Sequence, residues 1–313
     1  MTAPRREGQT FAGPSALSRW ASFVKLPHTV FALPFALTGV VLASRLAMPT
    51  VGQVGWVILA FTAARFAAMA FNRIVDRDVD AINPRTKMRE IPSGLLVLRH
   101  AKVSVIVAGS VFVAASWMLN PLCGMLSPLA LCWVLFYSFC KRFTRWSHLA
   151  LGLGLGIAPV GGYLAVTGAW SDPVWMLPVL AAAVMTWSGG FDILYALQDV
   201  AFDRANRLHS LPAALGERRA LGVARVLHVG TVLLLALVGL ATGGGVLYAL
   251  GVAVVALLLA YEHSLVKPDD LSKLDAAFFT MNGVISITFF TFVLLERALH
   301  LPSLATLLTR VSG

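Results

Sequence analysis

Carboxylate side chains recur at helical spacing in two segments of this 313-residue sequence. The first segment carries Asn72, Asp76 and Asp80, and the second carries Asp199 and Asp203. Side chains four residues apart lie on one face of a helix, so each segment directs two carboxylates the same way. Carboxylate and amide oxygens without nearby Cys or His are suitable ligands for a hard ion such as Mg²⁺. The spacing therefore predicts a divalent metal site shared by the two segments.

Basic residues gather around the same segments. They are Arg65, Arg85, Lys87, Arg89, Lys141 and Arg142, and Lys87 could equally serve only as a topology signal. Arg65 lies inside an apolar run, where a charge without an anionic partner would be costly. Mg²⁺ is usually held through a few carboxylates together with substrate phosphates, and guanidinium and ammonium groups bind the phosphate oxygens that the metal leaves free. The basic residues thus predict a diphosphate ligand, and the apolar surroundings favour a lipid diphosphate such as an isoprenoid diphosphate.

Long apolar runs carry these residues. Of all residues 58% are hydrophobic and 13% are charged, whereas about one quarter is charged in an average soluble domain. Runs long enough to cross roughly 30 Å of hydrocarbon recur along the chain. They predict spans at about 26–45, 52–72, 102–120, 124–140, 147–167, 173–197, 221–241, 245–262 and 277–296. The predicted fold class is an all-α integral membrane protein with about nine transmembrane helices.

The net charge of +10 is divided unevenly between the loops. Most Lys and Arg residues lie in the N-terminal segment and in alternate loops, which places these on the cytoplasmic side by the positive-inside rule. This sorting explains the basic composition without a nucleic-acid partner. Both carboxylate segments then lie at the cytoplasmic ends of even-numbered spans and can face each other. Four facing carboxylates would repel one another unless cations were present.

Two smaller features are assigned to packing. The three cysteines, Cys123, Cys132 and Cys140, lie in or beside apolar runs and show no metal-binding spacing, so we expect them to be packing residues. The LGLGLG run at 151–156 lacks the context of a phosphate-binding loop, and we expect close helix packing there.

The two carboxylate segments resemble the signature motifs of the UbiA superfamily of intramembrane prenyltransferases. The N-x-x-x-D-x-x-x-D signature matches 72–80, and D-x-x-Y-A-x-Q-D-x-x-x-D matches 192–203. Smaller matches are VKLPHTVFALPFAL, REIPSG, YSFCKRFT and FFTMNGVIS. The resemblance covers nearly the whole chain and implies nine transmembrane helices around a central cavity, with the site near the cytoplasmic face of the cell inner membrane.

Within the superfamily, the LPHTVFALPFAL and HSLPAALG runs look most like 4-hydroxybenzoate polyprenyltransferases and their relatives in the futalosine route to menaquinone. Arg207 departs from the usual continuation of the second motif and puts the acceptor in question. We expect an N-terminal cytoplasmic or interfacial segment at 1–25, a UbiA-type prenyltransferase domain at 26–300 and a C-terminal tail at 301–313. The resemblance implies an EC 2.5.1 enzyme of quinone biosynthesis that transfers a polyprenyl group, with Mg²⁺, to a 4-hydroxybenzoate-like or dihydroxynaphthoate-like acceptor.

The resemblance also implies roles for individual residues. Magnesium would be held by Asp76, Asp80, Asp199 and Asp203. The diphosphate would be bound by Arg65, Asn72, Arg85, Arg89 and Lys141, with an acceptor carboxylate as the alternative ligand of Arg65, Lys141 and Arg142. Asp192, Tyr195 and Arg142 would bind the acceptor or stabilise the prenyl cation.

Other readings of the sequence remain open. A membrane transporter also has intramembrane carboxylates, but its polar groups should lie near the midplane and at both gates, whereas here they gather at one face. A CDP-alcohol phosphotransferase needs a glycine and an arginine at fixed places between its aspartates, and this chain lacks them. A prenyltransferase with another acceptor, such as a homogentisate, a porphyrin derivative or a glycerol phosphate lipid, is a further alternative.

Overall fold

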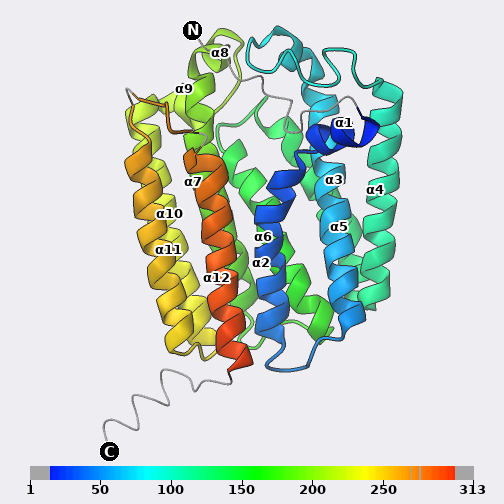
Figure 1. Ribbon diagram of the computed structural model, residues 1–313, viewed down its shortest axis with the longest axis vertical. Helices are drawn as coiled ribbons and strands as arrows, with labels where there is room; N and C mark the ends of the chain where they lie inside the picture. The colour runs from blue at the N-terminus through cyan, green and yellow to red at the C-terminus, as the bar shows by residue number, and fades with distance from the viewer. Residues whose placement is uncertain (1–14, 269, 275, 300–313) are drawn as a thin grey trace, which may run out of the picture.

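Long helices standing side by side form the body of the protein in the computed structural model (Figure 1). The structure describes residues 15–268, 270–274 and 276–299, so the tail predicted at 301–313 and most of the segment at 1–25 lie outside it. The helices are α1 (Ala16–Phe23), α2 (Leu26–Ala43), α3 (Val51–Ile82), α4 (Leu98–Leu119), α5 (Pro121–Cys140), α6 (Ser147–Thr167), α7 (Met176–Ala196), α8 (Val200–Ala205), α9 (Leu211–Leu215), α10 (Glu217–Ala241), α11 (Val246–Leu265) and α12 (Asn282–Ala298). A 3₁₀ turn, Leu197–Asp199, joins α7 to α8, and a π-helical turn, Ala276–Met281, precedes α12.

The all-α, multi-pass character predicted from the sequence is confirmed. Within the described residues, 7 helical segments are long and apolar enough to cross a membrane. They correspond to seven of the predicted spans, and the other two predictions, 26–45 and 277–296, fall on α2 and α12. The total of nine spans stays a prediction, because α12 has only 17 residues and, of α2, only the shorter apolar part Ala32–Ala43 enters this comparison.

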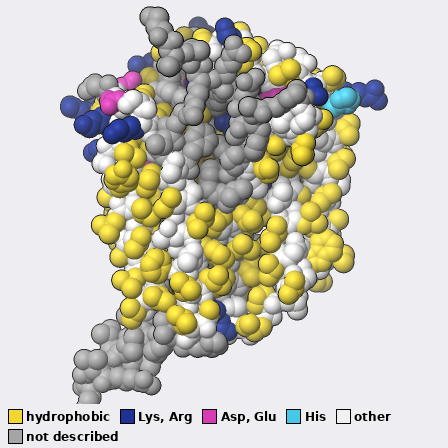
Figure 2. All heavy atoms as spheres, viewed as in Figure 1, with side chains coloured by type: hydrophobic (Ala, Val, Ile, Leu, Met, Phe, Trp, Pro, Cys, Tyr) yellow, Lys and Arg dark blue, Asp and Glu magenta, His cyan; other side chains and the backbone are white. Residues whose placement is uncertain are grey.

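Charged side chains are concentrated at one end of the helix bundle. Figure 2 shows Lys and Arg side chains at the end that carries α1, α8 and α9, above a broad hydrophobic surface, and few at the opposite end. We call this end, with the loops at 83–97, 141–146, 206–210 and 266–274, the charged end. The pattern agrees with the loop-by-loop division of charge expected from the sequence.

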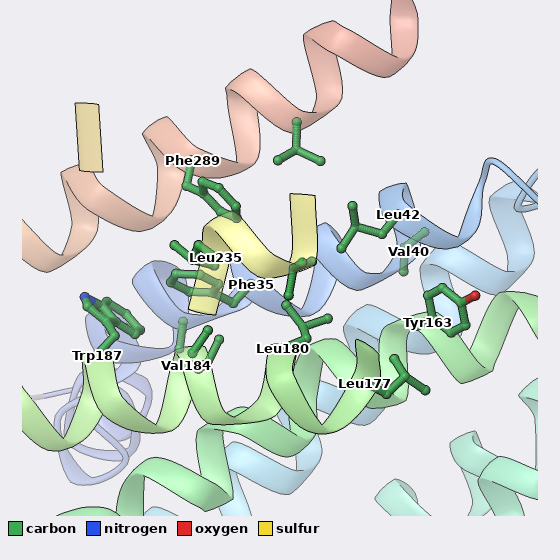
Figure 3. Close-up of a cluster of buried hydrophobic side chains, with 14 of the residues drawn as sticks. Phe35, Val40, Leu42, Tyr163, Leu177, Leu180, Val184, Trp187, Leu235 and Phe289 are labelled. Carbon is green, nitrogen blue, oxygen red and sulfur yellow. The ribbon is translucent and has the colours of Figure 1, made fainter. Parts of the chain in front are cut away.

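Aromatic and aliphatic side chains from α2, α7, α10 and α12 fill the centre of the bundle (Figure 3). Trp187 is almost fully buried, and its ring lies 4.6 Å from Phe35 and 4.9 Å from Phe191. Phe289 packs 6.1 Å from Phe35 and closes this aromatic cluster. Because lipid is as apolar as these side chains, their contribution comes mainly from close van der Waals contact between helices.

Glycines of α6 allow this helix to touch two neighbours backbone to backbone. A Cβ atom at Gly152 would collide with the carbonyl oxygen of Met185, and one at Gly156 would collide with that of Ala181, both in α7. A Cβ at Gly162 would collide with α2 in the same way. The expectation that the LGLGLG run serves close helix packing is therefore confirmed, and α6 is held at the centre of the bundle.

The prediction for the cysteines is correct at two positions of three. Cys123 and Cys140 are buried, but Cys132 is exposed on the outer surface of α5. The prediction for Cys132 was wrong because an apolar span has a face that contacts lipid, and a small apolar side chain is equally acceptable there.

Candidate active site

A cavity of about 240 Å³ lies at the charged end, between α2, α3, α5, α6 and α7. Its walls include every site residue predicted from the sequence. These are Arg65, Asn72, Asp76, Asp80, Arg85, Arg89, Lys141, Arg142, Asp192, Tyr195, Asp199 and Asp203. They come from four separate parts of the chain, so the fold brings the two carboxylate segments together as the spacing predicted. We call this space the charged cavity.

The length of α3 places the first carboxylate segment at the charged end. The helix has 32 residues and begins with a capping box formed by Thr50 and Gln53. At 1.5 Å per residue it is about 48 Å long, more than the roughly 30 Å of hydrocarbon that it must cross. Its last turns therefore extend to the charged cavity. There the Asn72 amide donates a hydrogen bond to Asp76 across 3.0 Å, as expected for side chains on one face.

The second carboxylate segment is not one regular α-helix. The spacing of Asp199 and Asp203 predicts one regular helix for this segment, whereas in the structure α7 ends at Ala196 and a 3₁₀ turn precedes α8. The Tyr195 carbonyl accepts a hydrogen bond of 2.9 Å from the Gln198 side chain, which satisfies this backbone group at the irregular turn. Both aspartates nevertheless line the charged cavity.

Each of the four predicted metal-binding carboxylates faces a basic side chain. The pairs are Arg89–Asp80 at 2.6 Å, Arg85–Asp199 at 2.6 Å, Lys141–Asp203 at 2.9 Å and Arg142–Asp76 at 3.3 Å. The cations offset the mutual repulsion that four neighbouring carboxylates would otherwise experience. The structure thus brings together the acidic and basic groups that were predicted separately from the sequence.

Arg85 makes the most extensive of these contacts. Its Nε and Nη2 donate to the two oxygens of Asp199 at 3.0 and 2.6 Å, and its Nη1 donates to the Tyr195 hydroxyl at 3.3 Å. The Asn83 amide also donates to Asp199, at 3.4 Å. The planar guanidinium fork that matches a carboxylate in this way also matches two phosphate oxygens.

The residues of the charged cavity fit a hard cation. Asp80 is 4% exposed, and its Oδ2 is buried without a hydrogen-bond partner, so one carboxylate oxygen is available to a ligand. Among the described residues, no three Asp, Glu, His or Cys side chains are already arranged around one point. This arrangement suits Mg²⁺ in particular, because Mg²⁺ binds through few carboxylates and completes its shell with phosphate and water oxygens.

Lys25 is a site residue that the sequence reasoning missed. It lies at the junction of α1 and α2, where φ is 48°, and its ammonium group lies 5.7 Å from the centre of the Tyr195 ring. Burial, together with nearby Arg73 and Arg89, lowers the pKa of Lys25 well below its usual range. In the sequence it was only one of several basic residues before the first span, and its burial in the cavity is decided by the path of α1.

His148 was missed as well. Its Nε2 accepts a hydrogen bond of 3.3 Å from the Leu211 backbone N–H, which leaves the ring proton on Nδ1 in the neutral tautomer. Nδ1 then donates to Asp192 Oδ2, and these two atoms lie 2.6 Å apart. His148 is 3% exposed, so the imidazole holds the Asp192 carboxylate from behind at the wall of the cavity. No spacing relates these residues, since they lie on α6 and α7.

Arg65 stands apart from the ion pairs. It precedes Asp76 by eleven residues on α3, which corresponds to about 16 Å along the helix axis. Its Nε is buried without a hydrogen-bond partner, and it makes no ion pair with any described residue. A buried guanidinium without an anion is costly in a membrane and indicates that an anionic ligand binds there.

A second, mostly apolar cavity of about 180 Å³ begins at the level of Arg65. Its walls come from α2, α3, α4, α5 and α6, and we call it the apolar chamber. It shares Arg65, Tyr137, Leu151 and Leu155 with the charged cavity, so the two spaces meet inside the bundle.

Comparison with known proteins gives consistent matches. Residues 32–284 match the profile of the UbiA prenyltransferase family. A 4-hydroxybenzoate octaprenyltransferase of Sodalis glossinidius (strain morsitans) is 28% identical over 251 residues, which are 80% of this chain and 85% of that protein. Another from Alkalilimnicola ehrlichii is 29% identical over 234 residues, 74% of this chain and 78% of that protein.

Solved structures show the same fold. The apo structure of a UbiA homolog from Aeropyrum pernix K1 matches with a TM-score of 0.78 and 31% identity, covering 86% of this chain and 98% of that one. A UbiA homolog from Archaeoglobus fulgidus bound to DMAPP and Mg²⁺ matches with a TM-score of 0.67 and 20% identity, covering 89% of this chain and 99% of that one.

Proposed function

The chain belongs to the UbiA prenyltransferase family, and on that premise we propose that it transfers a prenyl group from a polyprenyl diphosphate to an aromatic acid, with Mg²⁺. The observation that carries the proposal is the junction of the charged cavity with the apolar chamber at Arg65 and Tyr137. A prenyl diphosphate has the same two parts, an anionic head and an apolar tail. The DMAPP and Mg²⁺ bound by the Archaeoglobus homolog support this choice of ligand.

We assign the metal to the carboxylates of Asp76, Asp80, Asp199 and Asp203, with the Asn72 amide beside them. When bound there, Mg²⁺ would neutralise the charge that grows on the departing diphosphate. The buried and unpartnered Oδ2 of Asp80 supports the assignment, as does the all-oxygen donor set.

The basic partners of these carboxylates have a second task in the proposal. Arg85, Arg89 and Lys141 lie within hydrogen-bond distance of aspartates in the described structure. With a cation on the aspartates, the same basic groups would bind diphosphate oxygens. Arg142 belongs to this end of the cavity too, because it binds Asp76 and the Val75 carbonyl.

The acceptor, in our proposal, lies between Arg65 and Asp192. This revises two of the expected roles: Arg65 moves from the diphosphate to the acceptor, and Arg142 moves from the acceptor to the metal end of the cavity, where it contacts Asp76. Arg65 has no anion within the described chain and would bind the carboxylate of an aromatic acid. Asp192, held by His148 at 2.6 Å, would accept a hydrogen bond from the hydroxyl of the same acceptor. Such a bond increases electron density on the ring and directs one ring carbon toward the prenyl group. The Sodalis and Alkalilimnicola relatives, by their names, act on 4-hydroxybenzoate, which has both groups.

The reaction follows from these placements. The C–O bond of the prenyl diphosphate breaks, and Arg85, Arg89 and Lys141 stabilise the diphosphate that leaves. The allylic cation lies at the entrance of the apolar chamber, where water is excluded. The ring of Tyr195, stacked 4.1 Å from Phe278, lies at the same wall and offers its π electrons. The acceptor ring forms the new C–C bond, then loses a proton and regains aromaticity.

We also propose where the enzyme works. An inner membrane with the charged end toward the cytoplasm agrees with the distribution of Lys and Arg (Figure 2). In that membrane the polyprenyl diphosphate, the aromatic acid and the surrounding lipid would be its partners. A 4-hydroxybenzoate-like or dihydroxynaphthoate-like acceptor would place the reaction in quinone biosynthesis.

An acceptor panel tests the proposal. Purified protein is incubated with a radiolabelled polyprenyl diphosphate, Mg²⁺ and 4-hydroxybenzoate, dihydroxynaphthoates or homogentisate in turn, and label is followed into extractable product. We expect product with at least one aromatic acid, loss of product with EDTA and recovery with added Mg²⁺. Absence of product from every acid, with folded protein, would reject the proposed acceptor class. Product that persists in EDTA would reject the metal.

A further inference from the structure

We propose that the protein has a binding site for an anionic glycerophospholipid in a groove between α10 and α11, separate from the charged cavity. The groove has a volume of about 590 Å³, and its walls include Arg225, Val229 and Leu233 of α10 with Ala256 and His263 of α11. No residue lines both this groove and the charged cavity. The site therefore does not depend on the proposed reaction.

Polarity changes along the groove in the order found in a phospholipid. Arg225, His263 and Ser264 lie toward the charged end, and the walls are apolar at Leu233 and Ala256. From Arg225 to Leu233 the helix advances about 12 Å at 1.5 Å per residue. A lipid headgroup at the charged end would thus be followed by apolar walls over the first part of its acyl chains.

Two arginines of α10 form a seat for the headgroup phosphate. Arg218, Gly222 and Arg225 are four and three residues apart, so they lie on one face of the helix. Both arginines are exposed and have no hydrogen bond or ion pair within the described residues, although Glu217 is next to Arg218 in the chain. Arg218 and Gly222 continue this face of α10 beyond the groove toward the charged end, and a Cβ atom at Gly222 would meet no atom within 4 Å, so the helix surface is open there. Charge complementarity therefore selects an anionic headgroup.

Two imidazole rings form a polar inner wall at the upper part of the groove. His228 Nε2 donates to the Trp187 carbonyl at 3.2 Å, so its Nδ1 accepts the hydrogen bond of 3.0 Å from His263 Nε2. His228 is buried and His263 is half-buried. The ester and glycerol region of a phospholipid lies just below its phosphate and would cover this wall better than hydrocarbon chains alone.

Lipid-dependent thermal stability tests the site. The unfolding midpoint of the purified protein in detergent is measured with added phosphatidylglycerol or with phosphatidylcholine of the same acyl chains. We expect phosphatidylglycerol to raise the midpoint more. The double substitution Arg218→Gln with Arg225→Gln should abolish this difference, because it removes both positive charges from the seat. Gly222→Leu should also abolish it by filling the seat, and the added Cβ meets no atom within 4 Å.

Two matched variants control for general effects. Arg99→Gln removes an exposed charge at the start of α4, and Gly230→Leu adds the same side chain elsewhere on α10, where a Cβ also meets no atom within 4 Å. Both should keep the difference between the two lipids. Equal midpoints with both lipids in the unsubstituted protein, or an unchanged difference in the double variant, would overturn the proposal. So would an equal loss in Arg99→Gln, which would indicate nonspecific attraction.

Prenyl transfer is assayed in the same preparations so that the two proposals fail separately. Turnover without a lipid difference would reject the phospholipid site and leave the proposed function standing. A difference in unfolding midpoint between the two lipids without any prenylated product would support the phospholipid site and reject the proposed function.

Discussion

Replacement of Arg65 by methionine tests the acceptor site directly. Methionine retains much of the length of the side chain and removes its charge. Because Arg65 has no hydrogen bond or ion pair among the described residues, the substitution breaks none within them, and removal of a buried charge is not expected to destabilise the fold. The variant should therefore be purified in the same folded state as the unsubstituted protein.

The size of the effect follows from the lost contact. A hydrogen bond to a charged group contributes about 1.5–3 kcal/mol, and about 1.4 kcal/mol corresponds to a factor of ten. Loss of the contact between Arg65 and an acceptor carboxylate should thus lower kcat/KM for that acceptor by about 10- to 150-fold. An acceptor without the carboxylate gains nothing from Arg65 and should lose little.

The assay compares 4-hydroxybenzoate with its uncharged amide at the same prenyl diphosphate concentration. In Arg65→Met the preference for the acid should fall, while the amide keeps its rate. Arg142→Met is the matched control, because Arg142 contacts Asp76 at 3.3 Å and should affect the acid and the amide equally. Equal losses for both acceptors in Arg65→Met would instead place Arg65 on the diphosphate. An unchanged preference would remove Arg65 from the acceptor site.

Three further predictions concern the metal, the acceptor hydroxyl and the packing of α6. Asp76→Ala should lower Mg²⁺-dependent turnover by at least about 100-fold, because loss of a residue that only supports a metal ligand already lowers metal affinity or activity by about 10- to 100-fold. Normal turnover at saturating Mg²⁺ would refute the assignment of Asp76 as a ligand. His148→Ala should lower kcat/KM for the acceptor about tenfold, because Asp192 loses the hydrogen bond that positions it and one such bond contributes about 1–1.5 kcal/mol. The KM for the prenyl diphosphate should change little. Equal effects on both substrates, or no recovery in His148→Asn, would indicate a purely structural role. Gly152→Val should reduce the yield of folded protein, because the new side chain collides with the α7 backbone, at a cost of about 1–3 kcal/mol or more. Gly161→Val, where a Cβ meets no atom within 4 Å, is the control, and equal yields of the two variants in size-exclusion chromatography would contradict the packing argument.

The sequence by itself determined the membrane-spanning elements and the chemical character of the site. Apolar length is a local property, so seven of the predicted spans coincide with helices that can cross a membrane. The four-residue spacing of Asn72, Asp76 and Asp80 is local too, and it placed these side chains on one face of α3. The family motifs are also short segments of the sequence, and the family assignment is confirmed.

Only the tertiary structure decided which of these groups meet and which stand alone. His148 and Asp192 are far apart in sequence and touch because glycines let α6 lie directly against α7. Lys25 is buried because the chain turns there from α1 into α2. Arg65 has no anionic partner among the described residues, because the aspartates predicted to bind metal already face other basic groups. Contacts between helices depend on which faces pack together, and that arrangement is a property of the whole bundle and not of any one segment.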